Sequence, residues 1–140
     1  MEICYFTTLF NVTELHKANI DIEVSAKPQF EGGRRVPGAN LVFSYTIEIT
    51  NHSNEVVKLL SRQWYINDGG ATVREVSGEG VIGEQPILGP QDSFSYQSWC
   101  PLKNKFGVMS GYYTFINVNT HQTFNVTIQP FLLLPDYQLN

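Results

Sequence analysis

The stretch that decides the fold runs from Leu59 to Cys100 and reads LLSRQWYINDGGATVREVSGEGVIGEQPILGPQDSFSYQSWC. It contains three strand-like runs, at residues 61–67, 72–76 and 93–99, in which apolar and polar side chains alternate. Such alternation is typical of a strand with one buried face. The first two runs are separated by Asp68-Gly69-Gly70, residues that tolerate positive φ and so predict a tight hairpin turn.

Between the second and third runs, the composition of residues 77–90 predicts a long irregular connection. Pro86 and Pro90 cannot donate a hydrogen bond to a strand ladder. Glycine is also frequent in this segment, which permits tight turns and close backbone packing. The deciding stretch therefore predicts short strands joined by turns.

The same alternation continues on both sides of this stretch. It predicts strands over Ile20–Ala26, Leu41–Thr50, Val56–Leu60, Tyr112–Val118 and Gln122–Gln129. We expect Pro28 to end or blunt the first of them, the region from Pro101 to Gly107 to be a loop, and the apolar residues 131–134 to pack back onto the domain. No segment predicts a helix longer than about one turn. The sequence thus indicates an all-β sandwich or barrel of about seven strands.

Composition fits a single globular domain. The chain has 140 residues, of which 42% are hydrophobic and 16% charged, which excludes a largely disordered protein. Its net charge of −4 and its lack of a run of basic residues argue against nucleic-acid binding, because phosphate contacts need clustered lysine and arginine. No apolar run approaches the ~20 residues that a membrane span requires.

The two cysteines, Cys4 and Cys100, predict free thiols in a reducing compartment rather than a disulfide framework. The first ten residues lack the basic region of a signal peptide. These features predict an intracellular, cytoplasmic protein.

Four motifs carry a resemblance to a known family: SRQWYI (61–66), EVSGEGVIGEQPIL (75–88), SFSYQSWCPL (93–102) and FGVMSGYYTF (106–115). They resemble the ApaG domain family, also called DUF525. The resemblance implies a fibronectin type III-like or immunoglobulin-like β-sandwich. It covers an ApaG domain over residues 19–134, which leaves a lead-in segment without a clear period over residues 1–18 and a tail over 135–140. The family has no agreed biochemical activity.

The segment Gly78-Glu79-Gly80-Val81-Ile82-Gly83 spells G-x-G-x-x-G, the pattern that holds pyrophosphate at a helix N-terminus in dinucleotide-binding proteins. Here two prolines and a glycine follow within seven residues and oppose a helix. We therefore predict a rigid loop whose glycines, Gly78, Gly80 and Gly83, serve backbone conformation. Binding of a small anion, pyrophosphate or a nucleotide by exposed N–H groups remains the alternative, although Glu79 and Glu84 would repel an anion.

Catalytic and metal-binding patterns are weak. His16, His52 and His121 do not show ligand spacing, although some bacterial members of the family are associated with cobalt and magnesium tolerance. Cys100 lacks a nucleophile signature, so a partly buried structural thiol is the better interpretation. No pair of carboxylates shows an acid–base arrangement. We predict no enzymatic activity, no metal and no cofactor, with an unrecognised hydrolase as the opposing hypothesis.

The contact candidates are Arg62, Val81, Ile82 and Trp99, whereas Trp64 is predicted to be core. Arg62 would share the face of Trp64 and pair with a carboxylate or cover the rim of the core. Trp99 stands where the family more usually has a small residue, which suggests an exposed anchor. Similar domains occur beside an F-box in a ubiquitin-ligase subunit and in a DNA-polymerase-interacting protein. This resemblance implies a protein-interaction module with an unidentified protein partner, and a weak homo-oligomer is left open.

Overall fold

The computed structural model describes residues 20–70 and 72–136, and these residues contain no α-helix. The strands in this part of the chain are β2 (Ile22–Phe30), β3 (Leu41–Asn51), β4 (Val57–Asn67), β5 (Arg74–Glu79), β6 (Ile87–Leu88), β7 (Ser93–Leu102), β8 (Gly107–Asn117) and β9 (Thr123–Leu133). The prediction of an all-β domain is confirmed. The short strand β6 was not predicted.

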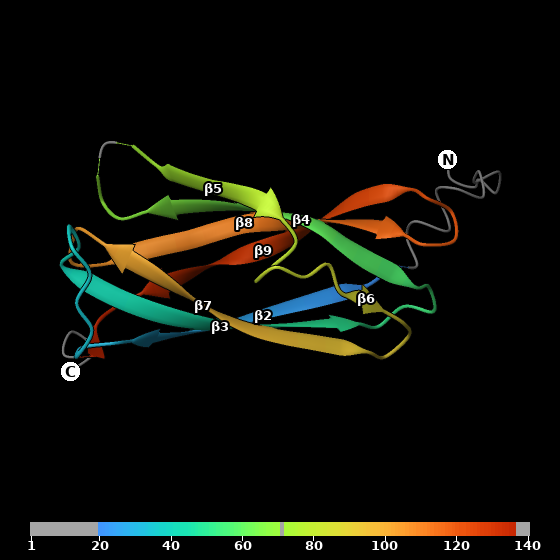
Figure 1. The fold of residues 1–140 in the computed structure, drawn as a ribbon, viewed down its shortest axis with the longest axis horizontal. Coiled ribbons are helices and arrows are strands. Elements are labelled where there is room, and N and C mark those ends of the chain that lie inside the picture. The colour runs from blue at the N-terminus through green and yellow to red at the C-terminus, as the bar shows by residue number, and fades with distance from the viewer. Residues whose placement is uncertain (1–19, 71, 137–140) are drawn as a thin grey trace, which may run out of the picture.

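The strands form two antiparallel sheets. One has the order β2-β3-β7, and the other has the order β5-β4-β8-β9 with β6 also paired to β4. Figure 1 shows the two sheets facing each other, with β5, β4 and β8 above and β3 and β2 below. This arrangement is a sandwich of the fibronectin type III type, as expected.

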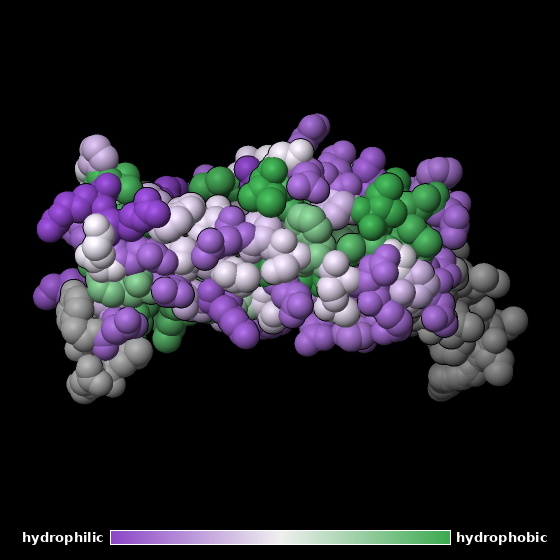
Figure 2. All heavy atoms as spheres, turned by 60° about the horizontal axis from the view of Figure 1, so that its bottom comes forward, coloured by the Kyte–Doolittle hydropathy of each residue, from purple (hydrophilic) through white to green (hydrophobic). Residues whose placement is uncertain are grey.

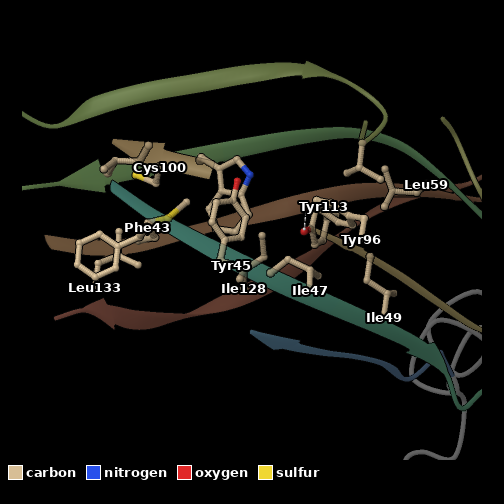
Figure 3. Close-up of a cluster of buried hydrophobic side chains, with 14 of the residues drawn as sticks. Phe43, Tyr45, Ile47, Ile49, Leu59, Tyr96, Cys100, Tyr113, Ile128 and Leu133 are labelled. Carbon is tan, nitrogen blue, oxygen red and sulfur yellow. Dashed lines mark hydrogen bonds between the residues drawn. The ribbon is translucent and has the colours of Figure 1, made fainter. Parts of the chain in front are cut away.

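The core lies between the sheets. Strand β3 contributes Phe43, Tyr45, Ile47 and Ile49 from the face that its alternation predicts, and all four are buried (Figure 3). From the opposite sheet Trp64 is 2% exposed, and its ring meets that of Tyr45 edge-on at 5.4 Å between centroids. The predicted core position of Trp64 is confirmed.

Two predicted strand boundaries are wrong because an edge strand can contain a proline. Strand β2 continues through Pro28, which pairs with Tyr45, and reaches Phe30. Strand β7 likewise includes Pro101. Both strands lie at the edges of their sheet, where a missing N–H group need not interrupt a ladder.

The expected short strand over residues 56–60 and the next over 61–67 are one strand, β4. Its pairing with β8 shifts register between Leu59 and Ser61, so Leu60 is an extra residue in a β-bulge. The bulge moves the inward positions from odd to even residues, with Leu59 buried before it and Trp64 buried after it. Because the alternation of buried and exposed residues changes phase at the bulge, the sequence of this single strand resembles that of two strands.

Strand β8 begins at Gly107, earlier than predicted. The glycines within it obscure the alternation of apolar and polar residues from which we predict strands. Gly111 has φ +157°, and a Cβ added there would lie 2.0 Å from the carbonyl oxygen of Gln63. A second register shift lies between Met109 and Gly111. The expected apolar tail also belongs to a strand, since β9 extends to Leu133, which is fully buried.

The predicted lead-in segment (1–18), Cys4 and His16 lie outside the described residues, as does the tail beyond residue 136. The domain boundaries that we expect there stay predictions. Within residues 20–70 and 72–136, no helix has the length and apolar character needed to cross a membrane.

Candidate functional site

The G-x-G-x-x-G segment is the end of a strand followed by a tight hairpin. Gly78 and Glu79 close β5. Val81 and Glu84 then exchange two backbone hydrogen bonds of 2.8 and 2.9 Å. The residues between them, Ile82 and Gly83, have φ values of 44° and 80°, the positive-φ pattern of a type I′ turn. The irregular connection between β5 and β6 is therefore shorter and more ordered than we predicted.

Gly80 is required by close backbone approach. Its φ is +61°, and a Cβ at this position would lie 2.1 Å from the carbonyl oxygen of Glu84. Its own N–H donates to the carbonyl oxygen of Leu60 at 2.8 Å. The glycine thus lets the chain turn back on itself immediately after β5.

This segment closes the edge of the sandwich. Figure 1 shows it descending from the end of β5 toward the other sheet. Val81 is fully buried in the hydrophobic core, and the side-chain amide of Gln85 donates to the carbonyl oxygen of Leu60 at 2.8 Å. Val81, predicted together with Ile82 as a contact residue, is therefore not available to a partner.

The side chain of Arg62 also holds this segment in place. It lies opposite Gly78 in the pairing of β4 with β5, and its Nη1 donates to the carbonyl oxygens of Glu79 (3.2 Å) and Gly80 (2.8 Å). A Cβ on Gly78 would lie 2.9 Å from its Nη2, so the glycine leaves room for the guanidinium group. These hydrogen bonds of Arg62 go to main-chain carbonyl oxygens, whereas the sequence led us to expect a carboxylate partner or cover for the rim of the core.

A pair of tyrosines lies in the core. The hydroxyl groups of Tyr96 and Tyr113 are 2.5 Å apart, as the dashed line in Figure 3 shows. Burial is the largest cause that raises the pKa of each phenol, so both stay neutral at physiological pH and one hydroxyl group donates a hydrogen bond to the other. No sequence signal indicated this pairing.

Three backbone donors of this segment are engaged in the fold. The N–H group of Gly80 donates to Leu60, and those of Val81 and Glu84 donate to each other's carbonyl oxygens. An anion-binding concavity requires N–H groups that are free and convergent. In addition, no helix occurs in residues 84–92, so the helix N-terminus of a dinucleotide site is absent there.

The thiol of Cys100 is only 1% exposed. Burial is the largest cause raising its pKa, and this outweighs the opposing charge of Arg74, whose Nη2 lies 3.6 Å from the sulfur. A buried thiol with a raised pKa is a poor nucleophile. Among the described residues, no group of three or more histidine, cysteine, aspartate or glutamate side chains could hold a metal ion.

Two of the predicted contact residues are exposed. Ile82 is 55% exposed at the tip of the hairpin, and Trp99 is 44% exposed on β7, with the guanidinium carbon of Arg34 at 4.7 Å from its ring centroid. Sequence reasoning missed Ile87, which is 59% exposed, because its isolated apolar pair with Leu88 resembles core. Figure 2 shows that apolar side chains form separate patches among polar ones on one face of the molecule.

Ile82 is the unusual member of this set. A positive φ is sterically costly for an L-residue and is most unfavourable for a β-branched one. Backbone strain of this kind persists where the surrounding structure over-determines it, and it is concentrated at functional positions. The tip of the hairpin is therefore the candidate functional site.

Comparisons with known proteins agree with the fold and the motifs. The sequence pattern of the ApaG domain, DUF525, matches residues 35–117. Protein ApaG of Mesorhizobium japonicum is 46% identical over 114 residues, covering 81% of this chain and 87% of the relative. Protein ApaG of Chromohalobacter salexigens is 39% identical over 120 residues, covering 85% and 94%.

The fold is also found in a solved relative. The crystal structure of an ApaA protein from Bordetella pertussis matches with a TM-score of 0.77 and 39% identity, covering 84% of this chain and 95% of that one. These names state no enzymatic activity. The chain belongs to the ApaG domain family.

Proposed function

We propose that this domain is a non-enzymatic protein-recognition module that inserts Ile82 into an apolar pocket of a partner protein. The observation that carries the proposal is the combination of strain and exposure at one residue. Ile82 has φ 44° and is 55% exposed. An isoleucine there contributes little to the core while straining the turn.

The fold itself favours a different residue at this position. Type I′ turns are stabilised by asparagine followed by glycine, because asparagine tolerates positive φ. Here Gly83 already fills the second position, whereas isoleucine fills the first. An exposed apolar side chain on a rigid turn is suited to anchor a protein contact.

Ile82 is not isolated. Val76, which lies before it on β5, is 38% exposed, and Ile87 after it on β6 is 59% exposed. Both β5 and β6 pair with β4, so the three exposed aliphatic side chains lie along one edge of this sheet. The anion-binding alternative has less support, since the backbone donors of Gly80 and Val81 are engaged.

Replacing Ile82 by asparagine is expected to raise the free energy of unfolding by roughly 0.5–1.5 kcal/mol. The gain comes from relief of the positive-φ strain, reduced by the loss of the partly buried side chain. Urea unfolding followed by tryptophan fluorescence measures the change. A loss of stability would show that Ile82 is held by packing and not by function.

The same variant tests recognition. Wild-type protein, Ile82→Asn and a control, Leu132→Asn, are used to capture proteins from native lysate, with quantitative mass spectrometry. Leu132 is 57% exposed but lies on β9, at the opposite edge of the same sheet. We expect a protein that wild type and Leu132→Asn retain and that Ile82→Asn retains at least about tenfold less. Equal capture by all three proteins would contradict the proposal.

A further inference from the structure

Among residues 20–70 and 72–136, strand β5 lies at the edge of its sheet and is exposed to solvent. It pairs with β4 on one side and ends the order β5-β4-β8-β9 on the other. Each of its six residues except Gly78 is exposed. Apart from the two-residue β6, the other edge strands of the described residues are β2, β7 and β9, and each contains a proline, at positions 28, 101 and 130. Proline blocks the addition of a further strand, and β5 has none.

Pairing identifies which main-chain groups of β5 face the open side. The N–H of Gly80 points inward, toward the carbonyl oxygen of Leu60. Main-chain groups alternate in direction along a strand, so those of Gly78 and Val76 also face β4. The N–H and C=O groups of Glu75 and Ser77, together with the N–H of Glu79, face outward. They form a row of donors and acceptors suited to an added strand.

Side chains on β5 restrict what can be added. Glu75, Ser77 and Glu79 share the outer face of the sheet, because Val76 lies opposite Trp64, which faces the core. A second copy paired antiparallel about Ser77 would place Glu75 of one strand opposite Glu79 of the other. Like charges directly opposite each other destabilise a sheet, so the charges of β5 disfavour self-association and favour a basic strand.

We propose that β5 binds an extended peptide by strand addition, and that this peptide carries lysine or arginine opposite Glu75 and Glu79. This inference rests on the proposed function, because it names the class of partner segment. The middle residue of a five-residue peptide segment lies opposite Ser77. The second and fourth residues lie opposite Val76 and Gly78, with their side chains on the inner face of the sheet. The pattern basic–apolar–polar–apolar–basic satisfies these positions in either strand direction.

The first test uses two synthetic peptides containing KVTVK or EVTVE, each labelled with a fluorophore and titrated with the protein while anisotropy is recorded. We expect saturable binding of KVTVK, and binding of EVTVE at least about tenfold weaker. Raising the salt concentration should weaken KVTVK binding. Equal affinities for the two peptides would overturn the inference.

A matched pair of variants tests the backbone contact. Ser77→Pro removes an N–H group that points away from β4, so the thermal midpoint should stay near that of wild type while KVTVK binding falls at least about tenfold. Ser77→Ala keeps the N–H group and should bind as wild type does. If Ser77→Pro stays folded and binds KVTVK as tightly as wild type does, the main-chain contact at Ser77 is wrong.

A charge exchange separates this surface from overall folding. The double variant Glu75→Lys with Glu79→Lys should prefer EVTVE to KVTVK, reversing the order of the two affinities. An unchanged order would contradict the assigned charges. Ile82→Asn should still bind KVTVK, because Ile82 lies outside β5.

The failures of the two proposals can be told apart. If KVTVK does not bind, and Ser77→Pro captures the same proteins from lysate as wild type does, the strand-addition site is wrong while recognition through Ile82 stands. If KVTVK binds as expected but Ile82→Asn loses no captured protein, the strand-addition site stands and the role of Ile82 is wrong.

Discussion

Replacing Trp64 by alanine is expected to lower the free energy of unfolding by about 3–5 kcal/mol, the cost of removing a large aromatic side chain from a packed core. Trp64 is 2% exposed and lies at the centre of a cluster of rings. Its ring centroid is 5.4 Å from that of Tyr45, 6.3 Å from that of Tyr113 and 6.0 Å from that of Phe131. The substitution therefore removes contacts to both sheets at once.

Trp99→Ala provides the matched control. Trp99 is 44% exposed, and its aromatic contact is with Arg34, an exposed cation–π pair of roughly 0.5–1 kcal/mol. We expect this variant to lose about 1 kcal/mol or less. Guanidinium unfolding curves of the two variants measure the difference. A loss below about 1 kcal/mol for Trp64→Ala would show that the core does not depend on this ring.

Gly80→Ala is expected to be the second most damaging change, lowering the free energy of unfolding by about 2–4 kcal/mol. Two effects add. The φ of +61° is unfavourable for alanine, and the new Cβ would lie 2.1 Å from the carbonyl oxygen of Glu84. Because that oxygen is main-chain, the clash is relieved only if the hairpin moves.

Gly83→Ala separates the two effects. Gly83 has a similar φ of +80°, but a Cβ added there meets nothing within 4 Å. We expect a loss of about 1 kcal/mol, which reflects conformation alone. The excess loss of Gly80→Ala over Gly83→Ala, both measured by urea unfolding, reports the close approach. Equal losses would mean that the contact with Glu84 does not constrain the fold.

The sequence was sufficient to predict strands and their buried faces wherever apolar and polar residues alternate without interruption. The face of β3 that carries Phe43 to Ile49 followed from period two, and the buried position of Trp64 followed from a large aromatic side chain in a predicted strand. Prediction failed where a residue interrupts the period without ending the strand. Leu60 in β4 and Pro130 in β9 lie at such points, and whether a strand continues past them depends on the neighbouring strand, which one sequence does not show.

The candidate site shows a second limit. Val81 and Ile82 are adjacent aliphatic residues, and we predicted the same role for both. The type I′ turn between Val81 and Glu84 sends one into the core and the other into solvent, which depends on backbone dihedrals. The reach of Arg62 across Gly78 to main-chain carbonyls is likewise a tertiary feature. The absence of a helix after Gly83, by contrast, followed from its prolines.

We propose that the G-x-G-x-x-G segment closes the sandwich and presents Ile82 to a protein, rather than holding phosphate. Calorimetric titration of the purified protein with pyrophosphate, ATP and NAD tests this most directly. We predict no saturable heat for any of the three, because the N–H groups of Gly80, Val81 and Glu84 donate within the fold. Saturable binding with a Kd below about 100 μM, lost in a Gly80 variant that remains folded, would instead assign the segment to phosphate binding.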